Sequence, residues 1–254
     1  SGNGTAGGTQ MITDLNNGFS PSSPRDFFED GNTLYFTAVV DTGGRELYKT
    51  NGTSSGTVRV CEINHGVGVS SNPNSFAKFG NKLLFMATNI NQTRLYQTNG
   101  TQQGTSVLKD ISVGFSDGYL NGRMIISGYD CTTGTGTELW STDGTAAGTT
   151  IIKDIQPGSD GSGASNFVLF DGRAFFTADD GIHGRELWVT DGTATGTSLF
   201  MDIKPGFASG LYDYTDLMVA GDSLFFVGYS DVSGYELWVS DGTVSGTKMF
   251  ADIC

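Results

Sequence analysis

The sequence has few of the residues that disulfide frameworks, metal sites and basic surfaces require. Its 254 residues include three Cys and two His, and 14 Lys and Arg stand against 27 Asp and Glu. Three cysteines are too few for a disulfide scaffold, and an odd number leaves a thiol free or bonded to another molecule. The formal net charge of −13 argues against nucleic acid, which binds basic patches. No apolar run has the length of a membrane span, so we expect no membrane insertion.

Motifs of common enzyme chemistry are also missing. His65 and His183 lie far apart, and neither belongs to a metal-binding pattern. The chain has no G-x-S-x-G elbow, no phosphate-binding loop and no dinucleotide fingerprint. We therefore expect no enzyme, no catalytic residue and no cofactor. The chain starts without an initiator Met, as a mature or excised segment would.

What the chain does have is glycine, 38 residues of it, and a motif that recurs. The clearest copy, Glu186–Ile203, reads ELWVTDGTATGTSLFMDI, and a partial copy opens the chain. The Asp or Asn of its D/N-G-T segment falls at residues 3, 51, 99, 143, 191 and 241. Successive positions are therefore 48, 48, 44, 48 and 50 residues apart. A motif repeated at such a period determines the fold.

Each full repeat has four strand candidates. In the fourth repeat they are Asn166–Phe170, Arg173–Ala178, Glu186–Thr190 and Ser198–Ile203, and Asp171-Gly172 joins the first two as a tight hairpin. The second strand is apolar on both sides, which is typical of a sheet covered on both faces. In the third repeat the first strand shrinks to Gly118–Leu120.

Four short antiparallel strands per repeat predict a β-propeller blade. We expect an all-β chain in which residues 1–254 form one five-bladed propeller with essentially no helix. The repeats are 16–63, 64–111, 112–155, 156–203 and 204–253, preceded by the partial repeat 1–15.

The partial repeat supplies an extra strand, Thr9–Leu15, near the point of closure. It could join the last blade, be the remnant of an upstream blade, or pair with another molecule; we favour the first. That arrangement would bring the first and last blades together and make Cys61 and Cys254 a candidate disulfide.

The acidic position of the D/N-G-T segment has two interpretations. A repeated acid could bind metal, or it could cap its own turn, since Asp and Asn tolerate positive φ and accept backbone N–H groups. Asn at residues 3, 51 and 99 keeps the geometry and loses the charge, which favours the cap.

One aromatic position and several loop acids are candidate ligand-binding residues. The aromatic residues could stack on sugars or pack between blades, and the loop acids could bind Ca²⁺, although solvated turns fit better. The ligand-binding candidates are Tyr48, Tyr96, Trp140, Trp188, Trp238, Asp41, Asp180 and Asp231. Further loop acids are Asp130 and Asp179, and N-x-T sequons make Asn3, Asn51, Asn91 and Asn99 glycosylation candidates if the protein is a secreted eukaryotic one.

In the motif E-L-W-x-T-D-G-T-x-x-G-T, the chain resembles the ELWxxDGTxxGT repeat family, whose members look like secreted or cell-surface β-propeller-type modules. The resemblance covers nearly the whole chain and is most specific in the last three repeats. Tyr48 and Tyr96 replace Trp in the first two, and Arg94 replaces Glu, which argues against a role that needs the Glu in every blade. The family implies no catalytic residues. In architecture alone, a ring of five such blades is similar to the tachylectin-2 type of lectin.

These observations favour a non-catalytic, secreted or cell-surface binding module that binds glycans weakly and multivalently. The alternative is a structural module that mediates protein–protein assembly at a cell surface or in an extracellular matrix. The expected partners are glycans or other surface proteins, with self-association through the extra strand or an unpaired Cys. The loops are uneven, since Tyr129 and Tyr229 lie near two of them while Asn89–Gln92 has no aromatic residue. This unevenness weighs against five equal sugar sites.

Overall fold

The computed structural model describes residues 5–16, 20–40, 43–65, 68–130, 132–212 and 215–252, with only the backbone of residues 116 and 117. The chain forms two compact units, Ser1–Asp110 and Ile111–Cys254, and each is described by itself. The described residues contain a 3-10 turn at Ala6–Gly8 and no α-helix. None of their helical segments has the length or apolar character to cross a bilayer.

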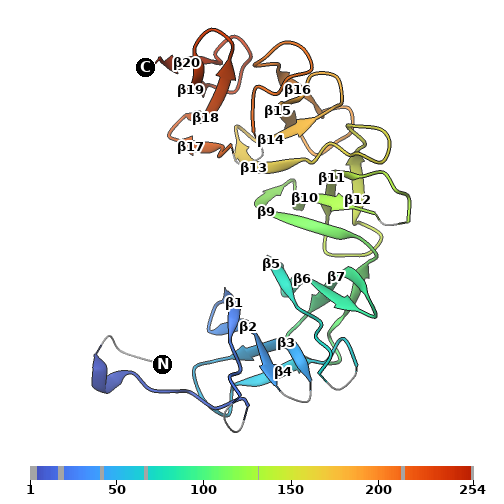
Figure 1. Ribbon diagram of the computed structural model, residues 1–254, viewed down its shortest axis with the longest axis vertical. Coiled ribbons are helices and arrows are strands. Elements are labelled where there is room, and N and C mark those ends of the chain that lie inside the picture. Colours follow the sequence, from blue (N-terminus) through green and yellow to red (C-terminus); the bar gives the residue numbers. More distant parts are fainter. Residues whose placement is uncertain are drawn as a thin grey trace. The chain divides into compact units, whose positions relative to one another are not determined.

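The described residues form five four-stranded antiparallel sheets (Figure 1). In the first unit, the first sheet comprises β1 (Arg25–Asp30), β2 (Thr33–Val40), β3 (Gly44–Thr50) and β4 (Val58–Cys61), and the second β5 (Asn74–Phe79), β6 (Lys82–Asn89), β7 (Gln92–Thr98) and β8 (Ser106–Lys109). In the second unit, the third sheet comprises β9 (Ser112–Leu120), β10 (Arg123–Tyr129), β11 (Thr137–Thr142) and β12 (Thr150–Lys153). The fourth comprises β13 (Ser165–Phe170), β14 (Arg173–Asp179), β15 (Arg185–Thr190) and β16 (Ser198–Met201), and the fifth β17 (Met218–Ala220), β18 (Ser223–Ser230), β19 (Gly234–Ser240) and β20 (Lys248–Ala251).

Each strand pairs with its neighbour in sequence. A two-residue turn joins the first two strands of every sheet. Asp171 and Gly172 both have positive φ, 50° and 69°, as the hairpin turn that matches strand twist requires. The predicted strands of the fourth repeat and the turn between its first two are confirmed within two residues at each end.

One expectation about an individual strand is wrong. Strand β9 has nine residues, not the short Gly118–Leu120, because pairing with β10 overrides the weak strand preference of its Gly and Ser residues. Residues Thr9–Leu15 form no ladder with a sheet of their own unit, and their pairing with the last blade, which belongs to the other unit, stays a prediction. Leu15 packs beside Phe36 and Tyr48 of the first sheet.

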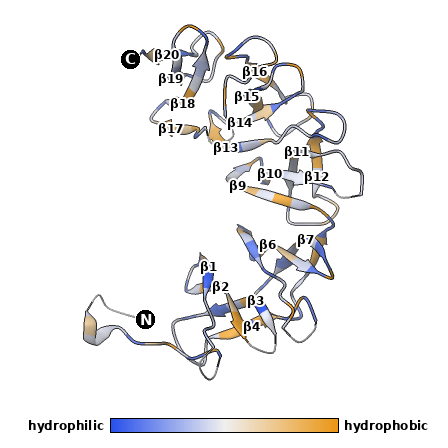
Figure 2. Cartoon of the chain, in the orientation of Figure 1, coloured by the Kyte–Doolittle hydropathy of each residue, from blue (hydrophilic) through white to orange (hydrophobic). Residues whose placement is uncertain are grey.

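The sheets of each unit bury apolar faces against one another. In the first unit, Tyr35 and Leu47 pack with Leu83 and Phe85. In the second unit, the fourth sheet uses both faces: Phe176 joins a cluster with the third sheet, and Phe175 joins one with the fifth. Hydrophobic segments accordingly lie on strands of both units (Figure 2). The prediction that the second strands are covered on both faces is confirmed for β14, whose Phe175 and Phe176 are both fully buried.

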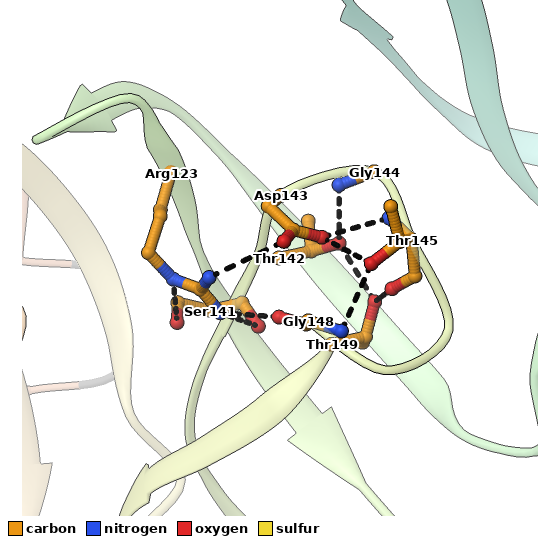
Figure 3. Close-up of polar contacts among 8 residues, drawn as sticks. All are labelled: Arg123, Ser141, Thr142, Asp143, Gly144, Thr145, Gly148 and Thr149. Carbon is orange, nitrogen blue, oxygen red and sulfur yellow. Dashed lines mark hydrogen bonds and ion pairs between the residues drawn. The ribbon is translucent and has the colours of Figure 1, made fainter.

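The D/N-G-T-x-x-G-T segment forms a hydrogen-bonded turn (Figure 3). In the third sheet, Asp143 Oδ1 accepts from Thr145 N at 2.9 Å and from Thr145 Oγ1 at 2.6 Å. Thr145 Oγ1 accepts from Gly148 N, and Thr149 Oγ1 donates to Thr145 O. Arg123 of β10 reaches over the turn to Gly148 O. The capping interpretation is therefore confirmed.

The same bonds recur with an amide or a carboxylate. Asn51 Oδ1 accepts from Thr53 N at 3.1 Å, and Asp191 Oδ1 accepts from Thr193 N at 2.8 Å. The bond from the Thr193 hydroxyl lowers the pKa of the Asp191 carboxyl. A Cβ on Gly196 would lie 2.1 Å from the Asp191 carboxylate, which explains the second Gly of the motif.

Three of the sheets each have a buried Glu that accepts hydrogen bonds from the segment leading to the following sheet. Glu186 Oε2 accepts from Ile203 N at 2.8 Å, and its Oε1 accepts from Gly210 N at 2.6 Å. Glu138 bonds Ile155 N and Ser162 N in the same way, both at 2.8 Å. The equivalent Glu46 bonds Ile63 N and Ser71 N.

We predict that Asp191→Asn leaves stability almost unchanged, because Asn51 makes the same turn bonds. Asp191→Ala should cost about 1 kcal/mol, as the loss of a side-chain cap does. Chemical denaturation of the two variants beside the parent checks this. An Asn variant that is destabilised as much as the Ala variant contradicts the capping role.

We predict that stability falls between pH 5 and pH 8 through Glu186. Burial raises the pKa of this carboxyl to about 7, against the opposing effect of its two N–H donors. The folded chain therefore holds a proton that the unfolded chain loses near its ordinary pKa of 4.5. This contribution is complete below pH 4.5 and is lost as the pH rises through 7; it amounts to at most about 3 kcal/mol.

Melting temperatures of the parent and of Glu186→Gln, which cannot ionise, check this prediction. The parent should lose more stability than the variant over that pH range. Glu29→Gln, at an exposed position, serves as the matched control. Equal losses for the parent and Glu186→Gln contradict the prediction.

Candidate binding site on the fifth sheet

The aromatic residues predicted as sugar platforms lie inside the sheets. Tyr48, Tyr96, Trp140 and Trp188 are each 4–5% exposed, and Trp238 is half-buried. Four of the rings pack on phenylalanines of the neighbouring second strands, as in Phe85–Tyr96 (5.7 Å) and Phe226–Trp238 (6.2 Å), and Trp140 pairs with Ile126. The structure therefore gives this position the packing role that the sequence left open.

The loop acids that are described have local partners. Asp180 Oδ1 accepts from the backbone N–H groups of Ile182 and His183. Its Oδ2 lies 2.8 Å from His183 Nδ1, and this bond raises the pKa of His183.

The other loop acids also have partners nearby. Asp231 forms an ion pair with Lys204, with 2.9 Å between the carboxylate oxygen and Nζ. Asp130 and Asp179 accept from Thr132 N and Gly181 N.

No three His, Cys, Asp or Glu side chains gather as a possible metal site within the described ranges. Asp41 lies outside those ranges, and Ca²⁺ binding stays a prediction.

The modification candidates are placed only in part. Asn51, Asn91 and Asn99 are exposed, whereas Asn3 lies outside the described residues. Cys61 is buried and free, and burial raises the pKa of its thiol to about 11. Its predicted partner Cys254 is also outside the described residues.

An aromatic pocket lies on the fifth sheet. Tyr212, Thr215, Asp216, Val227 and Tyr235 line a space of about 470 Å³. Tyr212, Thr215 and Asp216 belong to the segment that enters the sheet, Val227 to β18 and Tyr235 to β19. The two tyrosines are 40% and 53% exposed, and their ring centroids are 5.2 Å apart.

The tyrosines are held by a second layer of contacts. The ring of Tyr229 lies 4.9 Å from that of Tyr235, and Lys204 Nζ lies 4.4 Å from the Tyr229 centroid. Lys204 in turn pairs with Asp231. Tyr212 N donates to Thr215 Oγ1 at 3.0 Å and fixes the entering turn.

The pocket combines two exposed aromatic rings with a carboxylate. Asp216 is exposed and lines the pocket, where its carboxylate can accept hydrogen bonds from a ligand. A space of this size with apolar walls and few polar groups is typical of a small-molecule site. It offers stacking and hydrogen-bond acceptance.

Sequence reasoning found only the margin of this pocket, through Asp231 and Tyr229. Tyr212, Asp216 and Tyr235 were missed. The available signal was a departure from the repeat: the residue before the motif Glu is Arg45 in the first repeat and Arg185 in the fourth, but Tyr235 in the fifth.

Comparison with known proteins shows the fold alone. No protein-family model and no curated protein matches the chain. Similar solved structures include a puromycin hydrolase (TM-score 0.52, 15% identity, 89% of this chain and 37% of that one). A puromycin-hydrolysing peptidase of Mycobacterium tuberculosis has a TM-score of 0.51 and 11% identity, over 89% of this chain and 37% of that one. A prolyl endopeptidase has a TM-score of 0.51 and 14% identity, over 91% of this chain and 35% of that one.

These neighbours are β-propeller proteins, and this chain has a β-propeller-like all-β fold. The chain spans 35–37% of the length of these three neighbours.

Proposed function

We propose that this chain is a non-catalytic binding module that recognises glycans weakly at a cell surface or after secretion. The observation that carries the proposal is the tyrosine pocket of the fifth sheet. Aromatic faces stack on the C–H faces of sugar rings, and carboxylates accept from sugar hydroxyls; the pocket has both groups. The resemblance to the ELWxxDGTxxGT repeats supports the extracellular location.

The names of the neighbours do not make this chain a hydrolase. At 11–15% identity the likeness concerns the fold, and most of each neighbour has no counterpart here. The exposed aromatic rings and the carboxylate of the pocket are groups that bind a sugar, and they support a binding role.

The proposed architecture is a closed ring of five blades. Within each unit, the last strand of one sheet inserts an apolar side chain toward the next sheet: Val60 joins the cluster of Leu83 and Phe85, and Phe200 joins that of Leu224 and Phe226.

In the last sheet the equivalent residue, Phe250, is 60% exposed. The first sheet has an open apolar pocket of about 280 Å³ lined by Leu34 and Phe36, the counterparts of Leu224 and Phe226. Exposed apolar surfaces of this kind are usually covered. An exposed Phe250 on the last sheet and an open apolar pocket at the corresponding place of the first sheet support the proposal that Phe250 closes the ring.

We predict that Phe250→Ala lowers the stability of the monomer by about 3 kcal/mol, as the loss of a core Phe does. Phe207→Ala, at a side chain that is 83% exposed, is the matched control and should change stability by less than about 0.5 kcal/mol. Denaturant unfolding with light scattering measures both. A Phe250→Ala variant as stable as the control rejects closure, and one that instead dissolves an oligomer supports the structural alternative.

We predict that the intact domain binds in a broad glycan screen and that binding persists when calcium is removed by chelation. No described acidic cluster requires the ion, and the pocket supplies its own acceptor. An absence of hits under both conditions rejects glycan recognition and favours the protein–protein assembly module.

A further inference from the structure

The first and fourth sheets share a hydrogen-bonded triad at the position where the fifth sheet has its pocket. In the fourth sheet, Arg185 Nη1 donates to Thr177 Oγ1 at 3.2 Å and to Gly163 O at 3.0 Å, and Asn166 Nδ2 bonds the same Thr at 3.2 Å. In the first sheet, Arg45 donates to Thr37 at 3.0 Å. Asp26 accepts there from Thr37 at 2.8 Å.

Strand pairing identifies the counterparts in the fifth sheet. Thr177 pairs with Leu187 and Asp179 with Arg185, just as Val227 pairs with Leu237 and Tyr229 with Tyr235. Val227 and Tyr235 therefore occupy the places of Thr177 and Arg185.

The first strands of the two sheets, β13 and β17, relate Asp216 to the third member of the triad, Asn166. Val168 pairs with Phe175, and Met218 pairs with Phe225. Asn166 and Asp216 both lie two residues before those positions, and Asp216 lines the pocket beside Val227 and Tyr235. Because Val227 has no hydroxyl and Tyr235 has no guanidinium, the bonds that fill this space in the other two sheets cannot form, and Asp216 is left facing the pocket.

The position stays open to solvent on a covered sheet. The fourth sheet packs against the fifth through Phe175 and Phe200, yet Arg185 and Asn166 remain half-exposed. By comparison, covering the apolar face of the fifth sheet would leave Tyr235 and Asp216 accessible to solvent.

We propose that the fifth sheet carries a site for one neutral pyranose ring, an inference that rests on the proposed glycan-binding function. Tyr212 and Tyr235 stack on the ring, and Asp216 accepts from two of its hydroxyls. Lys204 is already paired with Asp231, so the carboxylate of Asp216 repels sugars that carry their own carboxylate. The filled triads leave no equivalent pocket in the first and fourth sheets, in contrast to the five near-equal pockets expected from the repeats.

The test is isothermal titration calorimetry with methyl glycosides of glucose, galactose, mannose and N-acetylglucosamine, and with methyl glucuronide. We expect at least one neutral glycoside to bind with a stoichiometry of one, and the glucuronide to bind at least tenfold more weakly. Val227→Thr/Tyr235→Arg, which restores the triad, should abolish binding and keep the melting temperature. Asp216→Asn should reduce the difference in affinity between the neutral glycosides and the glucuronide.

Tyr129→Ala, at an exposed tyrosine of the third sheet, is the matched control and should bind as the parent does. A stoichiometry of several sites, or unchanged binding by the triad-restoring variant, overturns this inference and leaves glycan binding standing. Binding of glucuronide as tight as that of the neutral sugars overturns the role of Asp216. Should the triad-restoring variant unfold, Tyr235→Ala replaces it, with an expected loss of at least tenfold. An absence of binding by the parent to every sugar counts against the proposed function itself.

Discussion

The arrangement of successive sheets depends on a buried carboxylate that accepts hydrogen bonds from the segment between them. An inter-sheet segment has backbone N–H groups that no strand satisfies, and burying them unpaired costs free energy. Glu186 satisfies two such groups, at Ile203 and Gly210, and thereby fixes where the chain leaves one sheet and enters the next. Burial makes the charged form of this Glu costly, so the same contact couples folding to pH.

Where the Glu is replaced, the local bonding changes. The second sheet has Arg94 at this position, and its Nε lies 2.8 Å from Asp110. An ion pair with a half-exposed arginine is weaker than a buried carboxylate that accepts two backbone bonds. The hydrogen-bonded turns at the D/N-G-T segments nevertheless set the spacing of the last two strands in this sheet as in the others.

Much of the fold could be predicted from the sequence, because its signals are local. The hairpin at Asp171-Gly172 and the turn at Asp191 follow from residue types that favour positive φ and self-capping. Strand β9 was underestimated because its glycines hide a pairing that only the partner strand reveals. The position of Thr9–Leu15 depends on tertiary contacts, which the repeat pattern alone does not contain.

The candidate site was harder to predict, since it arises from what one repeat lacks. Comparing repeats emphasises shared residues, and so the shared aromatic position drew attention although it is buried. The pocket depends on Val227 and Tyr235 replacing a Thr–Arg pair that is adjacent only through the register of two strands. The proposed site thus lies where the Thr–Arg bonds of the first and fourth sheets are absent.

The most direct test of this account is an NMR titration of the domain, with labelled valine methyl and tyrosine ring groups, against the neutral methyl glycosides. The account predicts that the signals of Val227, Tyr212 and Tyr235 shift together and saturate, while those of Tyr48 and Tyr96 in the core stay in place. Shifts of the core tyrosines without any change at Val227 and Tyr235 would contradict it.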